Sequence, residues 1–236
     1  MKAILTALFL TFILVGCSQA NTQSKYQESS CSELTEKIIS FSRLTNFEKE
    51  KFFELKESRL QNYLRIFQEA AELNNLDWEL VSAVAFQESQ WNPKARSNTQ
   101  VKGMMMLTLP TAKSLGVMNR LDAKQSILGG AKYLADLKEQ IEFGTSSGDK
   151  IAFLLAAYNL GIGNVRSLVY SINKNTNEVT WLDLEDKLLN DTDQNSLPGN
   201  TNNYSRGQQT VDFVERVRDY YYLCLLYTSP SPRDRG

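Results

Sequence analysis

The sequence predicts a mainly α-helical fold, on three observations. Apolar residues recur at helical spacing in several segments, Gly, Pro and Asn interrupt these segments, and we find no convincing alternation of apolar and polar residues that would indicate a half-buried strand. The chain has 236 residues, of which 42% are hydrophobic and 22% are charged, so it can bury one sizeable core. We therefore expect one helical domain with short appendages.

The first helical segments lie between residues 32 and 73. Residues 32–58 are polar and helix-prone, and we expect them to form a helical N-terminal extension. From Arg59 the pattern of an amphipathic helix begins, because apolar residues stand at positions i, i+3, i+4 and i+7: Leu60, Tyr63, Leu64 and Phe67. The main domain, residues 59–224, is expected to start here.

An almost wholly apolar helix follows and is expected at the centre of the domain. Asp77 can cap its first turn, and the segment Trp91-Asn92-Pro93 ends it. Because apolar side chains occur nearly all round this helix, it should be buried. The later segments predict further helices over residues 110–115, 127–141, 151–160, 164–172, 181–189 and 204–222.

The N-terminus has the features of an export signal. Lys2 precedes an apolar run over residues 3–15, which is shorter than the ~20 residues that a spanning helix needs. The run ends in Leu14-Val15-Gly16-Cys17, which resembles a bacterial lipobox. That resemblance implies cleavage after residue 16 and lipidation of Cys17. The alternative is an ordinary signal peptide that contains a cysteine.

Lipidation would anchor the protein to a membrane without a spanning helix. Ser18 follows the cysteine, which by the sorting rule for such lipoproteins favours the outer membrane, with the protein facing the periplasm. Residues 17–31 are polar and should form a flexible tether. Residues 225–236 contain two prolines and no helical period, so we treat them as a non-native-looking tail outside the fold. Whether Cys31 and Cys224 pair is left open.

The composition excludes several classes of chemistry. The chain has no histidine, which removes Ser-His-Asp and Cys-His nucleophile systems and every histidine-based metal site. The net charge is −1 and the basic residues are scattered, so a nucleic-acid partner is not expected. The sequence has no phosphate-binding glycine loop and no zinc-type cysteine spacing. We expect no cofactor and no metal.

Glu88 is the strongest candidate for chemistry. It follows Val84 by four residues and Val81 by seven, so all three share one face of the apolar helix. Burial there would raise the pKa of the carboxyl and keep it protonated near neutral pH, as a general acid requires. The alternative is a structural glutamate at the end of the helix, solvated or hydrogen-bonded.

An ordered set of motifs surrounds Glu88: Gln87-Glu88-Ser89, Trp91-Asn92-Pro93, Ser97, Gly103-Met104-Met105-Met106, Ala157-Tyr158-Asn159 and Tyr204-Ser205-Arg206-Gly207. The set resembles the lytic transglycosylases of glycoside hydrolase family 23, and within them the membrane-bound transglycosylase F subgroup, over about residues 59–222. It implies a lysozyme-like fold of the goose-type and soluble lytic transglycosylase kind. Peptidoglycan glycan strands are the implied partner.

The resemblance implies that Glu88 is the catalytic acid and base. It implies a substrate-binding role for these residues: Ser97, Gly103, Met104, Met105, Met106, Tyr158, Asn159 and Tyr204. Each also has a plain structural interpretation, since methionines fill cores and Asn before Gly can end a helix. Two positions depart from the family's pattern. Met106 stands where many relatives have Gln, and Gln209 stands where an acidic residue is expected.

The implied reaction cuts the bond between N-acetylmuramic acid and N-acetylglucosamine without water and leaves a 1,6-anhydromuramoyl end. One carboxylate suffices when the substrate's own acetamido group assists. Two alternatives remain. A hydrolytic muramidase of the same fold would need a second carboxylate to activate water, and no matching motif supplies one. A catalytically inactive peptidoglycan-binding lipoprotein would not need a buried acid.

Overall fold

The computed structural model describes residues 42–190 and 205–228. Several predictions concern residues outside these ranges: the signal peptide, lipidation at Cys17, the tether, Cys31 and the site residue Tyr204. A compact unit extends from Arg43 to Leu225, and the description below concerns this unit.

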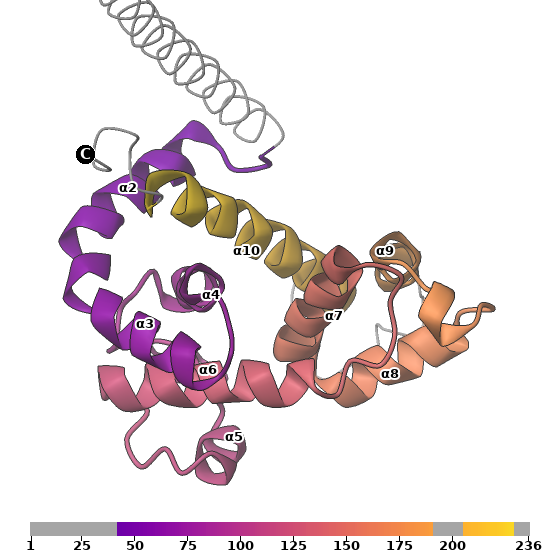
Figure 1. The fold of residues 1–236 in the computed structure, drawn as a ribbon, viewed down its shortest axis with the longest axis horizontal. Helices are drawn as coiled ribbons and strands as arrows, with labels where there is room; N and C mark the ends of the chain where they lie inside the picture. The colour runs from indigo at the N-terminus through magenta and orange to yellow at the C-terminus, as the bar shows by residue number, and fades with distance from the viewer. Residues whose placement is uncertain (1–41, 191–204, 229–236) are drawn as a thin grey trace, which may run out of the picture. The chain divides into compact units, whose positions relative to one another are not determined.

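The described residues are helical and contain no named strand, as the sequence predicts; two isolated bridges join Arg96 to Lys102 and Lys102 to Leu107. Figure 1 shows the arrangement of the helices. In chain order they are α2 (Asn46–Ser58), η1 (Leu60–Asn62), α3 (Leu64–Leu73), α4 (Trp78–Ser89), α5 (Leu109–Ser114), α6 (Ala123–Lys138), α7 (Ser147–Leu160), α8 (Ile162–Ser171), η2 (Thr176–Glu178), α9 (Trp181–Asn190) and α10 (Arg206–Thr228).

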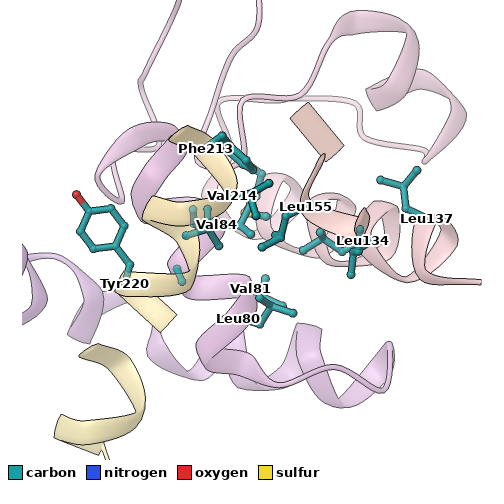
Figure 2. Close-up of a cluster of buried hydrophobic side chains, with 14 of the residues drawn as sticks. Leu80, Val81, Val84, Leu134, Leu137, Leu155, Phe213, Val214 and Tyr220 are labelled. Atoms are coloured by element: carbon teal, nitrogen blue, oxygen red, sulfur yellow. The ribbon is translucent and has the colours of Figure 1, made fainter. Parts of the chain in front are cut away.

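Helix α4 is the buried centre of the unit, as its apolar composition predicts. Every residue from Leu80 to Phe86 is buried, and α4 packs against α3 and α6. Side chains from α4, α6, α7 and α10 converge in one apolar cluster (Figure 2). This packing holds the C-terminal end of α4, which carries Glu88, in a fixed position.

Helix α2 belongs to the same core. The Phe52 ring is fully buried, and its centroid lies 4.9 Å from that of Phe86, 5.3 Å from that of Trp91 and 5.6 Å from that of Tyr220. The boundary expected at residue 59 is therefore too late. The polar composition of residues 32–58 concealed one inward aromatic that contributes to the core.

Other element boundaries also differ from the predicted ones. The helix expected from Arg59 is divided, since a short 3-10 turn precedes α3. Asp77 occupies the N-cap position of α4, but its side chain makes no capping bond and instead accepts a hydrogen bond from the Tyr221 hydroxyl at 3.2 Å. Helix α6 ends at Lys138, short of the expected residue 141. Helix α10 continues to Thr228, past the expected start of the tail at residue 225.

Replacing Phe52 with Ala tests whether α2 is part of the folding unit. The substitution removes a fully buried ring, so we expect the free energy of unfolding to fall by about 3–5 kcal/mol. Phe47→Ala is the matched control, because the Phe47 side chain on the same helix is 74% exposed. Urea denaturation measures both variants. Equal stabilities for the two would show that α2 is an appendage after all.

Candidate active site

Glu88 lies in the last turn of α4, where the chain turns sharply. Gln90 and Trp91 have positive φ angles of 51° and 55°. The Trp91 side chain is fully buried, and its indole N–H donates to the Ser82 carbonyl oxygen at 2.9 Å. Such strained backbone persists only where its surroundings hold it. The Trp91 anchor therefore fixes the end of α4, and with it the position of Glu88.

The methionine segment, residues 103–106, is hydrogen-bonded to the last turn of α4. The Ser89 hydroxyl lies 2.8 Å from the Met104 carbonyl oxygen. Gly103 has a φ of +88°, and a Cβ at this position would lie 1.7 Å from the Arg120 carbonyl oxygen. Only glycine fits such a conformation beside a backbone so close. The glycine of this motif is thus required by packing.

Of the four residues expected to form a wall of the cleft, only Met106 lines it. The Met104 and Met105 side chains are fully buried in the core. Met106 has a positive φ of 46° and is half-buried. The Met105 backbone still contributes to the site, because its carbonyl oxygen accepts a hydrogen bond from the Tyr158 hydroxyl at 2.8 Å.

Helix α7 brings Tyr158 and Asn159 to the site. A capping box of Ser146 and Asp149 starts the helix, and Gly161 at φ +92° ends it. The Tyr158 ring stacks on Phe213 with centroids 6.3 Å apart and lies 5.3 Å from the Tyr133 ring. Packed on both sides and hydrogen-bonded at its tip, Tyr158 has one available orientation.

Glu88 lies between two adjoining hollows. One has a volume of about 440 Å³ and is lined by Glu88, Thr99, Val101, Met106, Leu107, Thr108, Thr111, Tyr133, Tyr158, Asn159, Arg206 and Gln209. The other has a volume of about 320 Å³ and is lined by Gln87, Glu88, Asn159, Gln209, Asp212, Phe213 and Arg216. Glu88, Asn159 and Gln209 line both. The two hollows therefore adjoin at these three residues, and together they are called the groove.

Burial sets the protonation state of Glu88. It raises the pKa of this carboxyl from its ordinary value of 4.5 to about 8, because a low-dielectric environment disfavours the charged form. No side chain in the described part of the chain forms a hydrogen bond or ion pair with it. Burial likewise raises the pKa of Tyr158, and the negative charges of ionised Glu88 and Tyr133 raise it further. At neutral pH Glu88 is a proton donor facing a groove.

The structure brings together part of the predicted site. Glu88, Met106, Tyr158 and Asn159 line the groove. Ser97 does not line the groove. Its hydroxyl lies 2.8 Å from the hydroxyl of Thr99, and Thr99 lines the groove.

Sequence reasoning missed several residues of the groove, including Tyr133, Thr108, Arg206 and Asp212. Tyr133 has no local signal, since it looks like any residue of an amphipathic helix. Arg206 stood within a recognised motif, which was a usable signal. Asp, Glu and Cys side chains within residues 42–190 and 205–228 form no group of three or more that could hold a metal ion.

Sequence comparison identifies relatives of this chain. Residues 65–180 match the family described as the Transglycosylase SLT domain. The chain is 39% identical over 179 residues to a "Membrane-bound lytic murein transglycosylase F" from Photobacterium profundum, covering 75% of this chain and 34% of that protein. It is 44% identical over 168 residues to the protein of the same description from Shewanella loihica, covering 70% and 34%. The chain thus spans about a third of the length of the curated relatives it matches.

Two solved structures have the same fold. The 70 kDa soluble lytic transglycosylase from Escherichia coli superposes with a TM-score of 0.53 at 21% identity, covering 77% of this chain and 28% of that one. An inactive mutant of the lytic transglycosylase Slt from Pseudomonas aeruginosa gives 0.50 at 18% identity, covering 73% and 26%. The fold is therefore the lysozyme-like fold of lytic transglycosylases. Residues 65–180 of the chain therefore form a transglycosylase SLT domain.

The raised pKa of Glu88 predicts how stability depends on pH. The folded state holds a proton up to about pH 8, whereas the unfolded carboxyl loses it near 4.5. Stability is therefore lost as pH rises from about 4.5 to about 8. Glu88→Gln does not titrate, so its stability should exceed that of the wild type by a margin that grows over this range, to a few kcal/mol.

Denaturant unfolding at a series of pH values measures the margin. Glu72→Gln is the control for the substitution itself, because Glu72 is exposed on α3. A margin that stays constant from pH 5 to 9 would mean that Glu88 ionises at its ordinary pKa.

Proposed function

We propose that this chain is a peptidoglycan lytic transglycosylase in which Glu88 is the single catalytic acid and base. The observation that carries the proposal is a carboxyl that burial keeps protonated, with its pKa at about 8, in a residue that lines both hollows of the groove. A polysaccharide cut within its chain needs a groove that extends to either side of the reacting bond. The relatives named lytic murein transglycosylase support the substrate class.

The reaction has two steps in this proposal. Glu88 gives its proton to the oxygen that links N-acetylmuramic acid to N-acetylglucosamine, and the bond from that oxygen to the anomeric carbon breaks. The substrate's acetamido group shields the anomeric carbon. The Glu88 carboxylate then takes the proton of the muramoyl 6-hydroxyl, whose oxygen bonds to the anomeric carbon. Glu88 ends protonated again and no water is consumed.

Tyr158 and Asn159 position the substrate beside Glu88. Both line the groove, and both are held by hydrogen bonds to the protein, at 2.8 Å to Met105 and 3.0 Å to Thr210. Side chains held in this way need no reorganisation during the reaction, which is the usual origin of catalytic stabilisation in such sites.

Asp212 is the carboxylate that a hydrolytic muramidase would use in this groove as its second catalytic group. It lines the same hollow as Glu88 and Asn159, so a second carboxylate is present in the groove although no motif indicated one. One of its carboxylate oxygens accepts a hydrogen bond from the Gln208 side-chain amide at 2.9 Å. In a muramidase, Asp212 would activate water as a general base. In a transglycosylase, it has no step to perform.

Digestion of purified peptidoglycan tests the proposal, with mass spectrometry of the products. We expect anhydromuramoyl ends from the wild type, no turnover from Glu88→Gln, and anhydromuramoyl ends from Asp212→Asn at a rate within about threefold of the wild type, since Asp212 takes part in neither step of the proposed reaction. Reducing ends that disappear in Asp212→Asn would identify a muramidase. Intact glycan with the folded wild type would identify a binding protein.

We also propose that a lipid on Cys17 anchors the protein to the outer membrane, facing the periplasm. The lipobox-like segment and the relatives named membrane-bound support this. None of the helices that the structure describes has the length and apolar character needed to cross a bilayer. Labelled palmitate should be incorporated into the wild type and not into Cys17→Ala. Equal labelling of the two would refute the anchor.

A further inference from the structure

The first turns of α10 contact the end of α7 through Asn159. The Thr210 hydroxyl oxygen lies 3.0 Å from Asn159 Oδ1, and Arg206 Nη2 donates to the Asn159 carbonyl oxygen at 3.1 Å. Arg206 Nη1 in turn donates to Gln209 Oε1 at 3.1 Å. The positive charge of Arg206 suits the end of α7, because the C-terminal carbonyls of a helix carry partial negative charge. Both the backbone and the amide of Asn159 are thus held from α10.

Thr210 itself does not reach the groove. It is completely buried and is not among the residues that line either hollow. Buried hydroxyls are normally hydrogen-bonded. Any effect of this hydroxyl on the reaction must therefore pass through one of the two residues that it contacts, Asn159 or Arg206.

The single hydrogen of the Thr210 hydroxyl has two acceptors within reach. One is Asn159 Oδ1, and the other is the carbonyl oxygen of Arg206 at 2.9 Å. In an α-helix the Arg206 carbonyl also faces the backbone N–H four residues later, so it has a donor without the hydroxyl. The hydroxyl hydrogen is then left for Asn159 Oδ1, which has no other donor in the described part of the chain.

This bond sets the orientation of the Asn159 side-chain amide. With Oδ1 turned toward Thr210, the amide NH2 is the group left for the groove, whose two hollows Asn159 lines together with Glu88. The NH2 donates hydrogen bonds and so holds an oxygen atom of the sugar. An amide turned by 180° would present an acceptor there instead.

We propose that Thr210 is a positioning residue: its buried hydroxyl holds the Asn159 amide with the NH2 toward the glycan, next to Glu88. This inference rests on the proposed function, since it concerns how the same groove holds its substrate. Thr210 acts through Asn159 and takes no part in the bond changes.

Two substitutions separate the hydroxyl from the packing of Thr210. Thr210→Val keeps the shape and removes the hydroxyl, and Thr210→Ser keeps the hydroxyl and removes a methyl group. On soluble glycan strands we expect Thr210→Val to lower kcat about tenfold, the value of one hydrogen bond, with KM within about twofold. Thr210→Ser should restore most of kcat. Equal losses in the two variants would refute the proposal, because packing would then explain them.

A double-mutant cycle tests whether Thr210 acts through Asn159. In the Asn159→Ala background, Thr210→Val should have no further effect on kcat. The same tenfold loss in both backgrounds would show that Thr210 acts on its own and would overturn the inference.

A second readout does not depend on turnover and separates this inference from the proposed function. In the NMR spectrum of the full chain, the side-chain NH2 signals of Asn159 are those lost in Asn159→Asp. Thr210→Val should shift or broaden them, and Thr210→Ser should leave them in place. Unchanged signals in Thr210→Val refute the positioning role, whatever the digestion products are. Shifted signals in a protein that forms no anhydromuramoyl ends uphold the role and refute the proposed reaction alone.

Discussion

The withdrawal of the Glu88 carboxyl from water is the constraint on which the rest of the site depends. Glu88 lies in the last turn of a helix whose residues from Leu80 to Phe86 are all buried, and this environment, without help from a neighbouring charge, raises the pKa of the acid to about 8. A protonated carboxyl at neutral pH is a good proton donor, and after the transfer it is a base strong enough to take a proton back. One side chain can then serve both steps of the proposed reaction.

The surrounding structure keeps that carboxyl in place while leaving one side open to the groove. Trp91 anchors the turn after α4, Ser89 joins α4 to the methionine segment, and Tyr158 joins α7 to the same segment. Each link pairs a side chain with a backbone carbonyl, so each also satisfies a polar group near the core. The site thus consists of three chain segments that fix one another, which is what precise placement of a catalytic group requires.

Much of the fold could be predicted because its signals are local. The apolar run of α4 and the glycine after α7 indicated their elements correctly, and the position of Glu88 on an otherwise apolar face predicted that burial raises the pKa of its carboxyl. Asp77 shows the limit of such reasoning. It stands at a cap position, but its carboxylate accepts a hydrogen bond from the Tyr221 hydroxyl, 144 residues away in the sequence, and not from the first turn of the helix.

The remaining differences have the same physical origin. Whether Phe52 belongs to the core depends on rings from α4, the following turn and α10, which no local pattern of α2 contains. Met104 and Met105 lie in the core while Met106 lines the groove, because a positive φ at Met106 turns the chain there. Tyr133 and Asp212 reach the groove only through the packing of α6 and α10.

Direct titration of Glu88 tests the central claim most closely. In protein labelled with carbon-13 at the glutamate carboxyl groups, the Glu88 signal is the one absent from Glu88→Gln, and its chemical shift reports the proton directly. The account predicts a midpoint at about pH 8, far above the ordinary 4.5. A midpoint near 4.5 would contradict it, because the carboxyl would then be ionised at neutral pH and would have no proton to give.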